Sequence, residues 1–103
     1  MKNAFGISEK SYNLILSVFE KCPQVETVII FGSRAKGNFS QGSDIDLAIK
    51  GNTCSAELAL ELRAIINEQI PVPYSVDVLD YNSLDNLELK AHIDRVGLEF
   101  YKR

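Results

Sequence analysis

The stretch FGSRAKGNFSQGSDIDLAIK, residues 31–50, decides the fold and carries most of the chemistry of this chain. It begins where the apolar, largely β-branched run VETVIIF (25–31) ends, and such a run is typical of a central, buried strand. A polar segment rich in glycine and serine follows over residues 32–43. Residues 44–50 then alternate, with Ile45, Leu47 and Ile49 on one face. The stretch therefore predicts two strands joined by a polar loop.

Two carboxylates lie on the other face of the second strand. Asp44 and Asp46 are neighbours there, about 7 Å apart along the backbone, and they repel each other unless a cation lies between them. Mg²⁺ takes oxygen ligands of this kind, usually together with substrate phosphates. Asp77 lies in a separate predicted strand between two valines that face the core, so it projects from the opposite face. Three carboxylates on the polar face of two strands make a two-metal phosphoryl-transfer site reasonable.

The first strand ends at Gly32 and Ser33, which begin the polar segment. Glycine lets the backbone approach a phosphate closely, and backbone N–H groups and the Ser33 hydroxyl can then donate to its oxygens. Arg34 and Lys36 add positive charge where a triphosphate would lie. A Walker loop is excluded, because Asn38 stands where that motif requires lysine.

The other predicted elements surround these two strands. Ser8 and Ser83 are expected to cap helices, Pro23 ends the first of these, and Gly97 suits the end of the second. The expected elements are helices over 8–22, 55–70 and 83–96, a strand over 74–79 and a short strand or coil over 98–101. This order predicts an α/β or α+β fold, in which helices pack on a small mixed sheet.

Composition limits the possible functions. The chain has 103 residues and a net charge of −3, and we expect a single domain over residues 1–103. It has no apolar run near the roughly 20 residues of a membrane helix, and no lysine or arginine cluster that would bind nucleic acid directly. Cys22 and Cys54 form no C-x-x-C pair, and the N-terminus lacks a signal-peptide core, which favours a cytoplasmic protein with reduced thiols.

Four further residues have a structural interpretation. Asp80 is three positions from Asp77, so it points the opposite way, and we interpret it as a turn residue. We expect His92, the only histidine, to face solvent from a helix, and Tyr74 and Tyr81 to serve in packing.

The ordered combination of these motifs resembles a known family. GSRAKGNFSQGSDIDLAI is similar to the G-S-x10-D-x-D signature of the DNA polymerase β-like nucleotidyltransferases, and VDVLD resembles the segment that supplies their third carboxylate. The similarity covers residues 28–80, about half of the chain. With HIDRVGLEFY near its end, the chain looks like the minimal nucleotidyltransferases (MNT), which often act as antitoxins of a small helical HEPN-domain protein.

The resemblance implies a role for each matching residue. Gly32 and Ser33 would bind the phosphates of a nucleoside triphosphate, with Arg34 or Lys36 assisting. Asp44 and Asp46 would ligate Mg²⁺, and Asp77 would complete the second metal site and help to deprotonate the acceptor hydroxyl. The expected reaction transfers a nucleoside monophosphate, AMP from ATP, to a hydroxyl group on a HEPN toxin partner.

Two alternatives remain open at this stage. The protein could be a non-catalytic antitoxin that neutralises its partner by binding alone, or a transferase that modifies a small molecule, as antibiotic-modifying relatives do. The chain contains no acceptor-binding domain, which favours a protein partner over a small molecule. A homodimer or a hetero-oligomer is compatible with the sequence, and the exposed side of either the 55–70 or the 83–96 helix is the expected interface.

Overall fold

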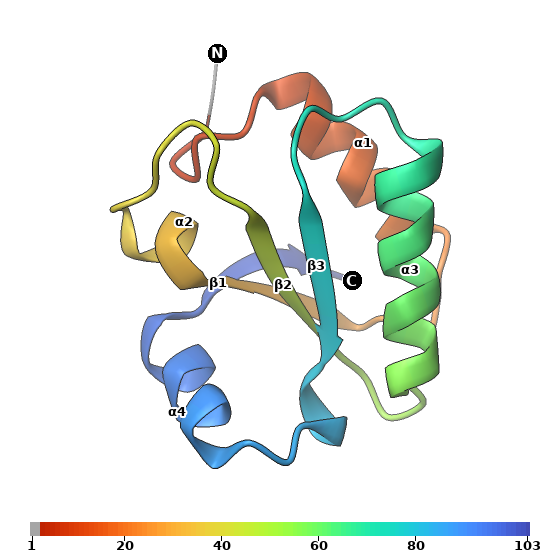
Figure 1. Cartoon of the computed structure of the whole chain (residues 1–103). Coiled ribbons are helices and arrows are strands. Elements are labelled where there is room, and N and C mark those ends of the chain that lie inside the picture. The colour runs from red at the N-terminus through yellow and green to blue at the C-terminus, as the bar shows by residue number, and fades with distance from the viewer. Residues whose placement is uncertain (1–2) are drawn as a thin grey trace.

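A computed structural model describes residues 3–103 of the chain. Its main elements follow the predicted order, with a short helix after the first strand in addition (Figure 1). The elements are α1 (Glu9–Glu20), β1 (Thr27–Phe31), α2 (Gly32–Lys36), β2 (Ile45–Lys50), α3 (Ala56–Gln69), β3 (Val76–Asp80), the 3-10 turn η1 (Tyr81–Ser83), α4 (Leu87–Val96) and β4 (Leu98–Lys102).

The strands form one four-stranded sheet in the order β3-β2-β1-β4. β1 is antiparallel to both β2 and β4, whereas β2 and β3 are parallel. The connection between β2 and β3 runs through α3, as a parallel pair requires. The predicted mixed sheet with packed helices is therefore confirmed, and residues 98–102 form a strand rather than coil.

Helices pack on both faces of the sheet, and they cover the two faces differently. α1 and α3 bury the larger core against one face, where Ile45, Leu47 and Ile49 point as predicted. On the opposite face, Ile93 of α4 packs against Ala48 and Phe31 in a smaller cluster. Asp46 lies beyond Ala48 on this second face and is only half-buried. Part of the polar face of the sheet is therefore accessible to solvent at the N-terminal end of β2, where Asp44 and Asp46 lie.

Side-chain caps define where the helices begin. Ser8 accepts a hydrogen bond from the Ser11 amide at 3.2 Å, as predicted for a helix N-cap. Ser55, predicted only to begin its helix, accepts one from the Leu58 amide at 3.1 Å and caps α3. The predicted Ser83 cap is wrong, because residues 81–83 form the 3-10 turn and Asn86 caps α4 instead. The Ser83 hydroxyl donates to the Asp80 carboxylate at 2.5 Å, so it is unavailable to a helix amide.

Gly97 ends α4 for a different reason from the one predicted. Its φ is −64°, so it does not adopt the left-handed conformation that favours glycine at a helix end. An added Cβ would instead overlap the Ile93 carbonyl oxygen and the Ile29 side chain. Glycine is required here because α4 passes close to β1.

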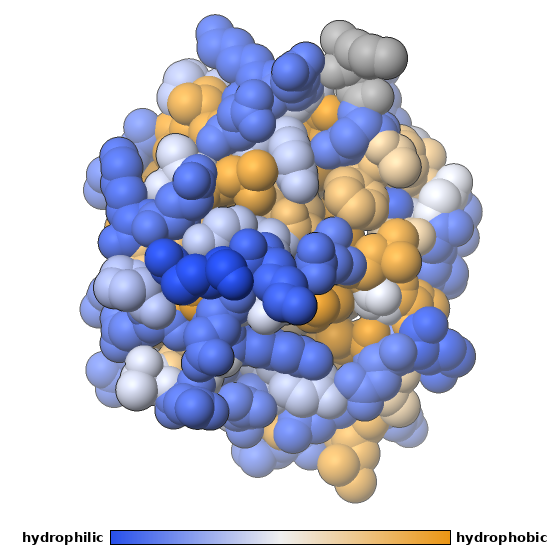
Figure 2. Space-filling model, turned by 180° about the vertical axis from the view of Figure 1, so that it is seen from behind, coloured by the Kyte–Doolittle hydropathy of each residue, from blue (hydrophilic) through white to orange (hydrophobic). Residues whose placement is uncertain are grey.

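The outer surface is mostly hydrophilic. Seen from behind, its hydrophobic residues gather on the side over β4 and α4 (Figure 2). The large hydrophobic side chains that are exposed are Leu60 on α3, Leu87 on α4 and Leu98 on β4. No helix within residues 3–103 has the length and apolar character that a membrane crossing requires.

Candidate functional site

The polar face of the sheet brings two of the predicted carboxylates together. Asp46 on β2 and Asp77 on β3 are directly paired in the parallel register, so their side chains leave adjacent strands on the same face. Neighbouring strands are separated by about 4.8 Å, which places the two carboxylates within reach of one ligand. Asp44 lies immediately before β2 and is exposed. Residues far apart in the sequence thus converge at one end of the β2–β3 pair.

Gly32 lies against this carboxylate pair. Its φ is +73°, a left-handed conformation that side chains other than glycine rarely adopt. An added Cβ would overlap the Asp46 Oδ2 oxygen. Glycine at this position lets the backbone that leaves β1 pass directly beside the Asp46 carboxylate, so the G-S and D-x-D motifs meet in space.

Ser33 and Lys36 follow in the short helix α2 (Gly32–Lys36). Ser33 is half-buried, and its carbonyl accepts the amides of Gly37 and Asn38 at 2.9 and 3.2 Å. Its hydroxyl makes no hydrogen bond within residues 3–103. Lys36 is exposed in the last turn of α2.

Arg34 differs from its predicted role at the triphosphate. It is only 1% exposed, and its guanidinium stacks against the rings of Phe39 and Tyr74 at about 5 Å. Its Nε and Nη2 both donate to the Ser43 carbonyl, at 3.1 and 2.8 Å, and its Nη1 donates to the Phe5 carbonyl at 2.8 Å. Because these donors are engaged in the interior, Arg34 is a structural residue here, a correction to the prediction.

The contacts of Arg34 nevertheless serve the site. The forked bond to the Ser43 carbonyl fixes the backbone of the residue that directly precedes Asp44. A weaker contact at 3.5 Å reaches the Gln41 carbonyl in the same loop. Arg34 therefore holds the loop that delivers Asp44 to the start of β2.

Asp77 has a neighbour that the sequence did not indicate. Arg63 reaches it from α3, with Nε 3.5 Å from Asp77 Oδ1. Both side chains are about half exposed, and an exposed pair of this kind contributes little stability. Asp77 therefore carries a weakly held counterion.

The electrostatics of the site favour a cation. Burial raises the pKa of Asp46 above its ordinary value, and repulsion from Asp77 and Asp44 raises this pKa further. A bound cation would relieve that repulsion, and three carboxylates supply the oxygen ligands that Mg²⁺ prefers. Within residues 3–103, no three acidic, imidazole or thiol groups already enclose a metal position. The residues fit the chemistry of magnesium, but their side chains would have to draw together around it.

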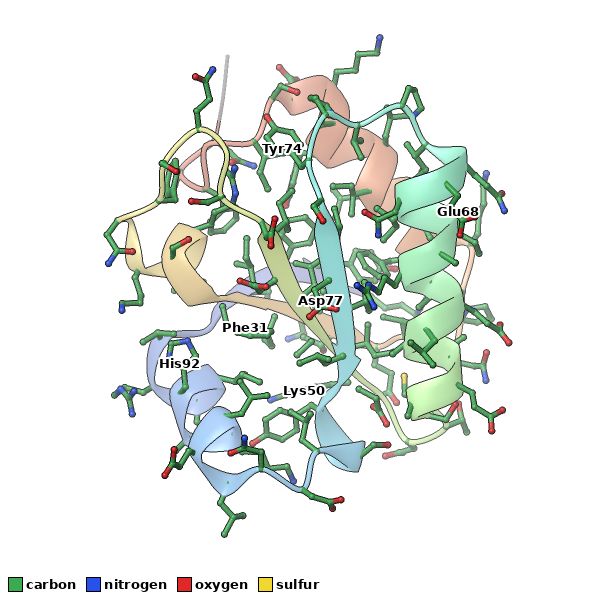
Figure 3. The ribbon with its side chains drawn as sticks, in the orientation of Figure 1. Phe31, Lys50, Glu68, Tyr74, Asp77 and His92 are labelled. Atoms are coloured by element: carbon green, nitrogen blue, oxygen red, sulfur yellow. The ribbon has the colours of Figure 1, made fainter. Side chains whose placement is uncertain are left out.

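His92 is a residue of the site that the sequence prediction missed. The prediction placed it in solvent, but it is half-buried on α4 and its ring meets Phe31 edge-on, with the centroids 6.1 Å apart. It lies close enough to Asp46 to lower the pKa of that carboxyl. Figure 3 shows His92 on the side of α4 that faces α2, next to Phe31. Only the packing of α4 against β1 and α2 brings it here, and no local pattern indicates that packing.

The residues assigned to structural roles divide into two groups. Tyr74 packs on the larger core and its hydroxyl accepts the Ser8 amide at 3.2 Å, and Tyr81 packs on the smaller cluster, so the packing role of both is confirmed. Asp80 points away from Asp77, as predicted, but it ends β3 and is 4% exposed rather than lying in an open turn.

Comparison with known proteins gives one family match. The family described as "Polymerase beta, Nucleotidyltransferase" matches residues 13–103, which is most of the chain. Among curated protein sequences, no match to this chain is found.

Several solved structures share the fold. A toxin–antitoxin structure with AMP-PNP superposes with a TM-score of 0.71 at 22% identity, over 89% of this chain and 73% of that one. The toxin–antitoxin MntA-HepT gives 0.68 at 19% identity, over 93% and 74%. A tri-AMPylated Shewanella oneidensis HEPN toxin in complex with MNT antitoxin gives 0.66 at 20% identity, over 92% and 72%. At these identities, the likeness shows the fold alone.

Proposed function

The chain belongs to the polymerase beta nucleotidyltransferase family, and we propose from this that it transfers AMP from ATP to a hydroxyl group on a protein partner in a magnesium-dependent reaction. One observation carries the proposal. The Asp46–Asp77 pair and Gly32, which are far apart in sequence, meet at one end of the sheet, with the Gly32 backbone against the Asp46 carboxylate. Two carboxylates beside a backbone turn with a free serine hydroxyl form a site for a metal-bound triphosphate.

Each residue has a role in this proposal. Gly32 admits the phosphate chain beside the backbone, and the Ser33 hydroxyl donates to a phosphoryl oxygen. Lys36, which is exposed on the same short helix, assists from the solvent side. Asp44 and Asp46 would hold magnesium, and Asp77 would complete a second metal position. Arg34 has no direct contact with the nucleotide and instead holds the loop before Asp44.

The reaction follows from these positions. The acceptor oxygen attacks the α-phosphorus of ATP, the bond from that phosphorus to the bridging oxygen breaks, and pyrophosphate leaves. The Asp77 carboxylate accepts the proton of the acceptor hydroxyl through Oδ2, because only its Oδ1 lies near Arg63, 3.5 Å from Nε. This exposed pair is weak and does not hold Asp77 back. When bound, magnesium would stabilise the attacking and leaving oxygens.

The acceptor in this proposal is a HEPN-domain toxin, which the protein neutralises in the cytoplasm as an antitoxin. Two structural relatives support this choice, since one is a complex of an MNT antitoxin with a tri-AMPylated HEPN toxin and another was determined with AMP-PNP. A protein acceptor can also reach this site, because Asp44 is exposed and Asp46 and Asp77 are only half-buried.

The experiment identifies the product of the adjacent gene, tests whether it is a HEPN-domain protein, and combines the chain with it, Mg²⁺ and ATP labelled in the α-phosphate. We expect label on the partner, and we expect Asp44→Ala and Asp46→Ala to abolish both labelling and neutralisation. Glu9→Ala, on the exposed first turn of α1 and outside both helices expected to contact the partner, is the matched control for loss of one carboxylate and should leave both unchanged. If the aspartate variants still neutralise the partner while no label is transferred, the protein acts by binding alone and the catalytic proposal fails.

A further inference from the structure

α4 (Leu87–Val96) brings one side chain with free hydrogen-bonding groups to the edge of the site. The helix packs against β1 and α2, and His92 lies at this contact. Its ring packs edge-on against Phe31, which directly precedes Gly32 in the chain. The imidazole therefore lies beside the turn that the proposed function assigns to phosphate binding.

The ring nitrogens of His92 have no partner among the described residues. Within residues 3–103, no hydrogen bond and no ion pair involves the ring, although it is half-buried. Lys90 on the same helix is different, since its ammonium lies over the Tyr81 ring, 5.1 Å from the centroid. His92 thus presents a polar edge toward the site that no protein group satisfies.

The site is also short of donors for an anionic ligand. Arg34 is the arginine nearest to Gly32 in the sequence, but its guanidinium already donates to the carbonyls of Ser43 and Phe5. Lys36 is exposed at the far end of α2. Among residues 3–103, the side-chain donors next to Gly32 that make no hydrogen bond are the Ser33 hydroxyl and the His92 ring.

We propose that the His92 imidazole donates a hydrogen bond to the β- or γ-phosphate of the bound nucleoside triphosphate and so completes the pyrophosphate end of the site together with Ser33. This inference rests on the proposed function and assigns a specificity residue within it.

The sheet order indicates which end of the nucleotide His92 contacts. Asp77 lies on β3, on one side of β2, whereas Phe31 and Gly32 lie at the end of β1, on the other side. Because His92 packs on Phe31, it lies on the Gly32 side of Asp46 and away from the Asp77 side, where the acceptor is deprotonated. An N–H donor at this position would contact the pyrophosphate leaving group rather than the acceptor hydroxyl.

Two variants separate the hydrogen bond from the packing. His92→Phe keeps an aromatic edge against Phe31 and removes the donor, whereas His92→Gln retains a donor of similar reach. Lys90→Ala is the control, because it removes a cation from the same helix on the Tyr81 side. Circular dichroism checks that each variant is folded before binding is measured.

Binding is measured by calorimetry with α,β-methylene ATP, which cannot release pyrophosphate, and with AMP, each in the presence of Mg²⁺. We expect His92→Phe to bind the triphosphate about tenfold to hundredfold more weakly, the range for a hydrogen bond to a charged group, and to bind AMP within twofold of the original protein. His92→Gln should recover part of the loss in affinity. Inorganic pyrophosphate should also bind more weakly to His92→Phe than to the original protein. Lys90→Ala should match the original protein.

The inference is overturned if His92→Phe binds the triphosphate analogue as tightly as the original protein does. It is also overturned if the variant loses affinity for AMP and for the triphosphate equally, since His92 would then act on the nucleoside or on the fold. Failure of the proposed function has a different signature, because the original protein would then bind the triphosphate analogue no more tightly than its Asp46→Ala variant does.

Discussion

Gly32→Ala tests the closest contact in the site. The variant places a Cβ where φ is +73° and directly against the Asp46 Oδ2 oxygen. The left-handed conformation costs an alanine about 1–2 kcal/mol. The overlap itself adds little stability loss, because the Asp46 carboxylate is the end of a side chain that can rotate away. That rotation, however, removes Asp46 from the position that we propose for the metal.

Gly37→Ala is the matched control for this change. Gly37 also has a left-handed φ, +85°, but an added Cβ there meets no atom within 4 Å. Both variants should therefore lose about the same free energy of unfolding, about 1–2 kcal/mol, or about 5–10 °C in Tm. Nucleotidyl transfer to the partner should fall at least about a hundredfold in Gly32→Ala and stay within about twofold in Gly37→Ala, measured at a temperature at which both are folded.

If Gly32→Ala keeps full transfer activity at a temperature where it is folded, the Gly32 backbone does not position Asp46 and the site geometry described above is wrong. Equal losses of activity in both glycine variants would mean that conformational strain, rather than the contact with Asp46, decides function.

Three further predictions concern the support of the site. Arg34→Met should lower the free energy of unfolding by about 3 kcal/mol, measured by urea denaturation, because it leaves the partly buried carbonyls of Phe5 and Ser43 without their donors and a buried site without its hydrogen bonds. A stable variant that only loses ATP affinity would contradict the structural role of Arg34. Asn67→Ala should lower the free energy of unfolding by about 1–3 kcal/mol in the same assay. The Asn67 side-chain amide donates to the Val76 carbonyl at 2.8 Å and accepts a hydrogen bond from the Val76 backbone amide at 3.0 Å, at the outer edge of β3. An unchanged urea midpoint would contradict this. Burial is the largest of the causes that raise the pKa of the Cys54 thiol to about 11. In a Cys22→Ser variant, the Cys54 thiol should therefore react with a disulfide reagent at pH 8 about tenfold more slowly than an ordinary cysteine. The thiolate fraction is about a hundredfold smaller, and the higher nucleophilicity of each thiolate offsets only part of that difference. Reaction at the ordinary rate would contradict this.

The sequence predicted those parts of the fold that local patterns determine. The alternation around Ile45, Leu47 and Ile49 predicted which face of β2 is buried, and Ser8 caps α1 as predicted because its hydroxyl accepts a hydrogen bond from an amide of the first turn. Spacing alone also predicted that Asp77 and Asp80 point in opposite directions.

What the sequence could not predict depends on contacts between distant segments. Ser83 has the residue type of a helix cap, but the carboxylate of Asp80 takes its hydroxyl and the helix begins after Asn86. Arg34 resembles a phosphate ligand in a glycine-rich segment until the 39–43 loop and residue 5 fold over it. His92 enters the site because α4 crosses β1, which depends on Gly97 and on the packing of Ile93.

The central claim is that Gly32, Ser33 and the three aspartates transfer the nucleotidyl part of ATP. The most direct test supplies the protein and the proposed HEPN-domain partner with Mg²⁺ and ATP labelled either in the α-phosphate or in the γ-phosphate. We expect the α-label to become covalently attached to the partner and the γ-label to be released as pyrophosphate. Attachment of the γ-label, or of neither label, would contradict this claim.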